Sequence, residues 1–360
     1  MNFPLQLSRF LVSLGLIATS AFSTANQDTK YAEPGFILSS IKPLQLIAAD
    51  INQGVIESVS LLPPGASPHA YALRPSQIKK IHAATAIYWV DPLLESFVKK
   101  SFNQYADKSF ALAALTVKPL ATTTAEALDH TLETPEQHAL HSDEEEAHSE
   151  HEEEHNTDTH LEDEQDAHQG HDDHQHSPVI HQHKYQGKDL HIWLSPAKAL
   201  QIAKLMQLNS TKLFPQHSAL LAANYQRFEQ NINDLDFQLN AQFNTLRGLG
   251  FLVFHDGYSR FVEHYQLNQL AAITLNPSKR SGAKHLAQLR DVINEDKPVC
   301  IFSEPQFSAA SVKTLVRNSA VNIAQLDPLA TDINVDKDRY VSFMKHFAQQ
   351  FIDCLGSSSP

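Results

Sequence analysis

The chain has 360 residues with 41 acidic and 28 basic side chains, and its formal charge is −13. Residues 130–183 contain 17 Asp and Glu, 13 of the 21 histidines and no Lys or Arg, so the rest of the chain carries a net charge of +4. No cluster of Lys and Arg stands out, which argues against a nucleic-acid partner, and two cysteines exclude both a disulfide scaffold and a cysteine-based zinc module.

The first 25 residues have the pattern of an export signal. Arg9 supplies a positive charge, residues 10–18 are apolar, and Ser23 and Ala25 provide small residues at the −3 and −1 positions of a cleavage site. The apolar run is too short to span the ~30 Å hydrocarbon core of a membrane. We therefore expect a signal peptide over residues 1–25 and a mature protein in the periplasm. In that oxidising compartment Cys300 and Cys354 either pair or remain as two free buried thiols.

Residues 36–117 alternate between predicted strands and helices. Residues 44–49 and 55–62 are interpreted as strands or buried segments, and residues 86–90 as a strand. Pro75 begins a predicted helix, and residues 93–102 are amphipathic. This alternation is typical of a parallel α/β sheet.

The acidic segment 130–183 interrupts this pattern. It has too few apolar residues to bury a core, so we expect disorder in the absence of a ligand. Its imidazoles and carboxylates are interpreted as a weak, multi-site collector of metal ions, with a solvated spacer as the alternative.

A long helix is predicted over residues 217–246, which contain no proline or glycine, after a shorter helix that starts at Ser195-Pro196. Its apolar stripe consists of Leu221, Tyr225, Phe228, Ile232, Leu235, Leu239 and Phe243. These residues follow one another at steps of three or four, as on one face of a helix. The stripe fits either a coiled-coil dimer seam or a helix that spans two lobes.

A second alternating block follows the long helix. Strands are predicted over 251–254, 270–275, 299–302 and 321–326, with helices over 258–265, 283–295, 308–320 and 335–355. The predicted fold class is therefore α/β, with two lobes built on parallel sheets and joined by a long rigid helix. The expected boundaries are 26–216 for the N-terminal lobe, 217–246 for the connecting helix and 247–360 for the C-terminal lobe.

Five residues of metal-binding types stand at or just beyond predicted strand ends. They are His69, His191, His255, Glu304 and Asp327. Ligands of open α/β sheets bind beyond the carboxyl ends of the strands. A crevice between the two lobes would therefore collect these side chains into one metal site.

Seven segments carry a resemblance to a known family. They are residues 41–44, 61–76, 88–95, 191–196, 253–258, 302–307 and 326–329. In this order, and with an acidic His-rich insert between the first two candidate histidines, they resemble the zinc-specific periplasmic solute-binding proteins of ABC transporters. The resemblance covers essentially the whole mature chain.

This resemblance implies His69, His191 and His255 as zinc ligands. It also implies that Asp327 lies near the fourth position, which a water fills in some zinc-binding members, and that Cys300 pairs with Cys354. Three neutral imidazoles independently suit zinc better than manganese, which prefers carboxylate and water.

The chain departs from the family at one position. Zinc-binding members often have a glutamate immediately before the first ligand histidine, whereas this chain has Pro68. The fourth position is therefore left to Asp327, a water or a histidine of the insert. Asp256 and Asp189 are candidates to orient the ligand imidazoles, with surface ion pairing as the alternative.

The resulting prediction is capture of Zn²⁺ by a monomeric periplasmic protein and its delivery to an ABC membrane permease, without catalysis. Manganese or nickel delivery is the alternative within the same class. Two alternatives come from other classes of protein. One is a zinc hydrolase with Glu304 as general base, and the other is a metal buffer or adhesin based on the insert.

Overall fold

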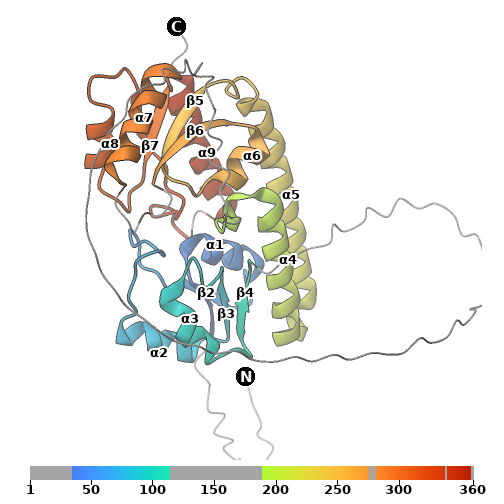
Figure 1. The fold of residues 1–360 in the computed structure, drawn as a ribbon. Helices are drawn as coiled ribbons and strands as arrows, with labels where there is room; N and C mark the ends of the chain where they lie inside the picture. The colour runs from blue at the N-terminus through green and yellow to red at the C-terminus, as the bar shows by residue number, and fades with distance from the viewer. Residues whose placement is uncertain (1–34, 114–188, 275–276, 278–280, 337–338, 358–360) are drawn as a thin grey trace, which may run out of the picture. The chain divides into compact units, whose positions relative to one another are not determined.

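The computed structural model describes residues 35–113, 189–274, 277, 281–336 and 339–357 (Figure 1). The expected signal peptide (1–25) and the acidic segment (130–183) lie outside these residues. Within the described part of the chain, no helix has the length and apolar character needed to cross a membrane.

The N-terminal lobe contains a four-stranded parallel sheet with the order β2-β1-β3-β4. Its strands are β1 (Phe36–Ser39), β2 (Glu57–Ser60), β3 (Ala86–Trp89) and β4 (Ser109–Ala111). Leu38 in β1 lies opposite Val59 of β2 and Ile87 of β3. The connecting helices are α1 (Lys42–Ile51), α2 (Pro75–Ala83) and α3 (Ser96–Asn103), and both α1 and α2 have a proline in the first turn.

One interpretation of the sequence is wrong: residues 44–49 do not form a strand. They belong to α1, in which Leu44, Leu46 and Ile47 are buried. A short continuous apolar run has the same pattern in a buried strand and in a helix that is covered on several sides. Pro43, in the first turn, was the local signal for a helix.

The C-terminal lobe repeats the architecture with the strand order β6-β5-β7-β8, again parallel. Its strands are β5 (Gly250–His255), β6 (Asn268–Thr274), β7 (Cys300–Ser303) and β8 (Asn322–Gln325), connected through α6 (Ser259–Tyr265), α7 (Ala283–Glu295) and α8 (Ala310–Leu315). The predicted α/β fold with two parallel sheets is thus confirmed.

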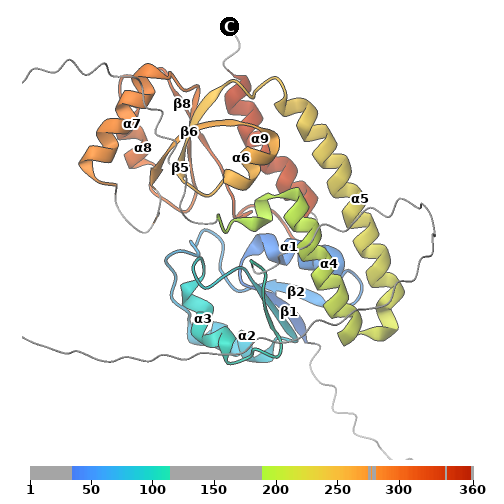
Figure 2. The same ribbon diagram turned by 45° about the vertical axis from the view of Figure 1, so that its right-hand side comes forward.

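A helical pair connects the two sheets. The segment η1 (Ile192–Leu194) leads into α4 (Pro196–Leu213), and after the short turn η2 (Pro215–His217) the chain forms α5 (Ser218–Phe243). Helix α5 packs against α1 and α4 in the N-terminal lobe and against α6 and α9 (Tyr340–Gly356) in the C-terminal lobe (Figures 1 and 2).

The predicted apolar stripe of α5 is buried within the chain, except that Asn224 is buried in place of the predicted Tyr225. Tyr225 is half-buried, while the neighbouring Asn224 is buried and donates from Nδ2 to the carbonyl oxygens of Ile51 and Gln53. The other six residues of the stripe belong to the core. Because other elements of the same chain cover this face, it is not a dimer seam.

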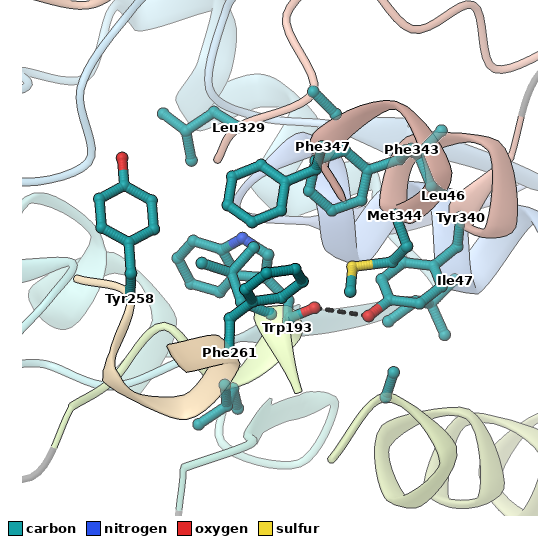
Figure 3. Packing of buried hydrophobic residues seen from close by; sticks show 14 of the residues in the cluster. Leu46, Ile47, Trp193, Tyr258, Phe261, Leu329, Tyr340, Phe343, Met344 and Phe347 are labelled. Atoms are coloured by element: carbon teal, nitrogen blue, oxygen red, sulfur yellow. Dashed lines mark hydrogen bonds between the residues drawn. The ribbon is translucent and has the colours of Figure 1, made fainter. Parts of the chain in front are cut away.

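Buried residues of both lobes form one continuous cluster, with Trp193 in its centre (Figure 3). The Trp193 indole Nε1 donates to the carbonyl oxygen of Pro328 at 2.7 Å, and the Tyr340 hydroxyl donates to the carbonyl oxygen of Trp193. Aromatic rings of α6 and α9, among them Phe261 and Phe347, surround these groups. This packing holds η1, and with it the preceding His191, against the C-terminal lobe.

Candidate metal centre

Three histidines from separate parts of the fold meet at one point. His69 lies in the loop that follows β2, His191 directly precedes η1, and His255 is the last residue of β5. One ring nitrogen of each lies within 4.8 Å of those of the other two. His191 Nε2 and His255 Nε2 are 3.2 Å apart. The structure therefore brings together the three histidines that the sequence singled out.

A glycine makes this close approach possible. A Cβ atom built on Gly257 would lie 2.3 Å from His255 Nε2 and 2.8 Å from His191 Cε1. Real Cβ atoms do not approach other atoms this closely, so any other residue at position 257 would displace both rings. Gly257 belongs to segment 253–258 of the family resemblance, but its steric role was not predicted from the sequence.

Two buried carboxylates orient two of the three imidazoles. His191 Nδ1 lies 2.8 Å from Asp189 Oδ1, and His255 Nδ1 is hydrogen-bonded to Glu304 Oε1. When Nδ1 carries the hydrogen and donates it to a carboxylate, Nε2 is left with its lone pair free for a metal. The structure thus places Asp189 as expected for an orienting group.

Asp256, the second expected orienting group, forms no such bond with any histidine in the described part of the chain. Its Oδ1 accepts a hydrogen bond from Gln269 Nε2 at 3.1 Å. Glu304 takes the orienting position at His255 instead, because it follows β7, the strand next to β5 in the sheet. Sequence order alone could not show this, since Glu304 and His255 are 49 positions apart in the chain.

Burial and charge keep the site suited to a cation. Burial, together with the neighbouring His191 and His255, lowers the pKa of His69 to about 3, so this imidazole is neutral. Burial alone would lower the pKa of His255, but the Glu304 carboxylate outweighs it and raises that pKa. The hydrogen bonds and charge of His191 outweigh burial at Asp189 and lower its pKa. The Asp189 and Glu304 carboxylates beside the imidazoles favour a divalent metal at this site.

The histidines line a small cavity between the lobes. Its volume is about 10 Å³, and Glu304 and Gln306 contribute to its wall. This is about the space that one water-sized sphere occupies. A cavity of this size accommodates a small ligand such as a metal ion.

Asp327 lies outside the group of three histidines. Its Oδ1 accepts from the backbone N–H of Leu329 and from Gln306 Nε2, both at 3.1 Å, and its Oδ2 accepts from the backbone N–H of Thr331. These bonds shape the loop whose Pro328 and Leu329 line the cavity. The idea that Asp327 is the fourth ligand remains a prediction.

Replacing Glu304 tests whether the orienting carboxylate contributes to metal affinity. We expect Glu304→Ala to weaken binding about 10–100-fold, as for other groups that orient a metal ligand. Glu304→Gln should lose less, because the amide oxygen still accepts the Nδ1–H bond. Competition titration against a chelator measures both.

Asp256→Asn is the matched control, because Asp256 is a carboxylate directly next to His255 in the sequence but bonds Gln269. Its affinity should stay near that of the unchanged protein. If Glu304→Ala bound metal as tightly as Asp256→Asn, the orienting role of Glu304 would be refuted.

Comparison with known proteins agrees with this geometry. A family model described as "Zinc-uptake complex component A periplasmic" (ZnuA) matches residues 37–354. The high-affinity zinc uptake system protein ZnuA of Haemophilus influenzae is 39% identical over 342 residues, covering 94% of this chain and 98% of that protein. The protein of the same name from Yersinia pestis is 36% identical over 321 residues, covering 89% and 91%.

Solved structures share the fold at lower sequence identity. A crystal structure of ZnuA aligns with a TM-score of 0.63 at 20% identity, covering 90% of this chain and 100% of that one. The periplasmic zinc-binding protein TroA from Treponema pallidum aligns with a TM-score of 0.64 at 15% identity, covering 90% and 99%.

Proposed function

Because this chain belongs to the ZnuA family of periplasmic zinc-uptake components, we propose that it captures Zn²⁺ in the periplasm for import by an ABC transporter. The observation that carries the proposal is the convergence of His69, His191 and His255 in a cavity of single-ion size. Each residue comes from a different segment, so the folded protein, rather than a short peptide, forms the site.

The donor set favours zinc over manganese. Zinc binds imidazole nitrogen at ~2.0–2.1 Å in a tetrahedral arrangement, whereas manganese prefers carboxylates and water. His255 is the most informative position, because a glutamate there would change the donor set toward manganese. The two nearest carboxylates, Asp189 and Glu304, are bonded to imidazole Nδ1 atoms and orient ligands.

The same contacts favour a carrier over a zinc hydrolase. A hydrolase would need room for its substrate and a general base beside the metal-bound water. The cavity has space for one ion, and Glu304, the candidate base, is bonded to His255. The relatives in the family are zinc-uptake components.

Delivery requires export and a membrane partner. We infer that residues 1–25 direct the chain to the periplasm and that a permease receives the ion there.

Residues 130–183 act as a weak collector that raises the metal concentration near the cavity, and the protein acts as a monomer. Helix α5 contacts both lobes, so it limits their movement and favours a preformed site.

Competitive metal titration of the full protein and of a variant lacking residues 130–183 tests the function. We expect one tight Zn²⁺ site in both, weaker binding of Mn²⁺, and additional weak zinc sites in the full protein alone. Turnover of a model ester by the zinc-loaded protein would favour the hydrolase. Loss of the tight site with residues 130–183 would favour a metal buffer.

A further inference from the structure

The side chain of Gln306 lies in the wall of the metal cavity with a fixed orientation. Its Nε2 donates to Asp327 Oδ1 at 3.1 Å and lies 3.4 Å from Thr331 Oγ1. A carboxylate only accepts hydrogen bonds, so the amide nitrogen must face Asp327. The amide oxygen is therefore directed away from Asp327.

That amide oxygen has no protein partner. Gln306 Oε1 is buried, and no group in the described part of the chain donates a hydrogen bond to it. A buried acceptor without a donor costs free energy unless another molecule supplies the donor. Gln306 lines the same small cavity as the three histidines, so a donor bound in that cavity would satisfy it.

A zinc ion held by the three histidines has a fourth coordination position to fill. Three imidazoles leave one vertex of a tetrahedral zinc ion. Pro68 precedes His69 and offers no ligand atom in its side chain. The oxygens of Asp327 already accept bonds from Leu329, Thr331 and Gln306.

We propose that Gln306 holds the fourth ligand of the zinc cargo, a water molecule whose hydrogen bond Gln306 Oε1 accepts. Asp327 acts as the anchor that orients the amide and is not itself a ligand. This inference rests on the proposed function, because it takes the three-histidine cavity as the zinc site.

An amide acceptor suits a carrier for a chemical reason. It orients the water but cannot remove its proton at neutral pH, as a carboxylate general base would. Gln306 therefore adds no general base beside the bound water. The Asp327 carboxylate also polarises the amide, which strengthens the bond that Oε1 accepts.

The test measures zinc affinity and the visible spectrum of Co²⁺, added at one equivalent to the full chain so that the tight site fills first. Gln306→Leu removes the acceptor, so we expect zinc affinity to fall about tenfold and the cobalt bands to shift as the geometry changes. Gln306→Glu retains an oxygen acceptor but loses the Nε2–H donor that bonds Asp327, so we expect it to bind zinc less tightly than the unchanged protein but more tightly than Gln306→Leu.

Gln269→Leu is the matched control. Its Nε2 also donates to an aspartate, Asp256, at 3.1 Å, but Gln269 does not line the cavity. This variant should keep both affinity and spectrum. Unchanged affinity and spectrum in Gln306→Leu, an equal loss in Gln269→Leu, or a loss in Gln306→Glu as large as that in Gln306→Leu would each overturn the inference. If the unchanged protein has no tight zinc site, the proposed function itself fails instead.

Discussion

Replacement of His255 by alanine, in a protein that lacks residues 130–183, is expected to weaken zinc binding about 100-fold. Tetrahedral zinc sites in proteins have binding free energies of ~10–16 kcal/mol, or about 3 kcal/mol for each of four ligands. His255 contributes the nitrogen at the end of β5 that lies 3.2 Å from His191 Nε2. Chelator competition measures the change, and omission of the acidic segment removes its weak sites from the titration.

His264→Ala is the control for this experiment. His264 also forms a bond to a carboxylate, since its Nε2 lies 2.7 Å from Asp236 Oδ1, but it belongs to α6 and lies outside the three-histidine group. Its removal should leave zinc affinity unchanged. Equal affinities of the two variants would mean that the zinc site lies elsewhere.

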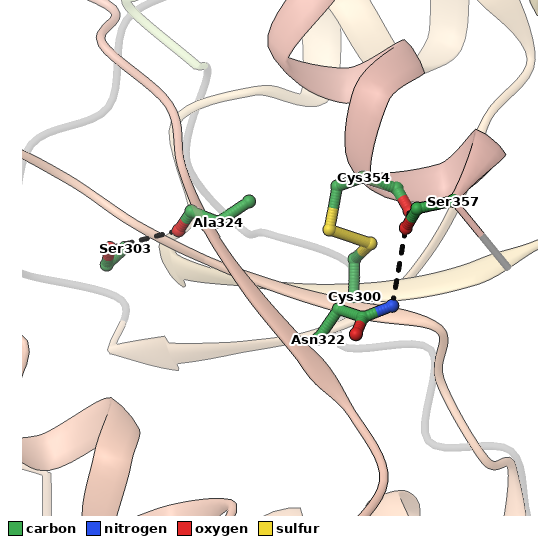
Figure 4. The surroundings of a disulfide bond; sticks show 6 residues. All are labelled: Cys300, Ser303, Asn322, Ala324, Cys354 and Ser357. Carbon is green, nitrogen blue, oxygen red and sulfur yellow. Dashed lines mark hydrogen bonds between the residues drawn. A yellow bond between two sulfur atoms is a disulfide. The ribbon is translucent and has the colours of Figure 1, made fainter.

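The second large effect concerns the disulfide between Cys300 and Cys354. Figure 4 shows that it joins the start of β7 to the last turns of α9. The bridged residues are 54 positions apart, and the chain-entropy model gives about 4 kcal/mol for a closed loop of this length. We expect Cys300→Ala/Cys354→Ala to lower the free energy of unfolding by about this amount in urea titration.

Zinc affinity provides the internal control for that variant. Cys300 begins β7, whereas Glu304 follows the opposite, carboxyl end of the same strand. The tight zinc site should therefore survive removal of the disulfide under conditions in which the protein remains folded. Reduction of the disulfide in the unchanged protein should lower its free energy of unfolding by the same amount. A loss below about 1 kcal/mol would show that the crosslink does not constrain the unfolded chain as the model requires.

Most elements were predictable because their patterns are local. Neighbouring residues alone define the apolar stripe on α5, which repeats every 3.6 residues, and the short apolar strands of the C-terminal lobe. The error at residues 44–49 has the opposite cause. Helix α1 lies under α4, α5 and α9, so it is apolar on several faces and loses the periodicity that distinguishes a surface helix from a strand.

The part of the candidate site that consists of motif residues was predictable from the sequence. His69, His191 and His255 were chosen from the sequence, and the fold brings their ring nitrogens within 4.8 Å. Gly257 was missed because its importance is steric and depends on two rings that meet above it. Gln306 was missed because a glutamine gains a metal-related role only when its partners are known.

The sequence by itself determined most of the strands and helices and the repeated α/β order, because these features depend on spacing along the chain. The resemblance of its motifs to a known family implied the three histidines. Only the tertiary structure decided which groups contact one another. Glu304, rather than Asp256, bonds His255, and Gln306 bonds Asp327. Trp193 packs in the core that both lobes share. These pairs are distant in sequence or depend on side-chain direction. A parallel sheet brings the carboxyl ends of its strands to one edge, but strand order and side-chain packing select which groups meet there.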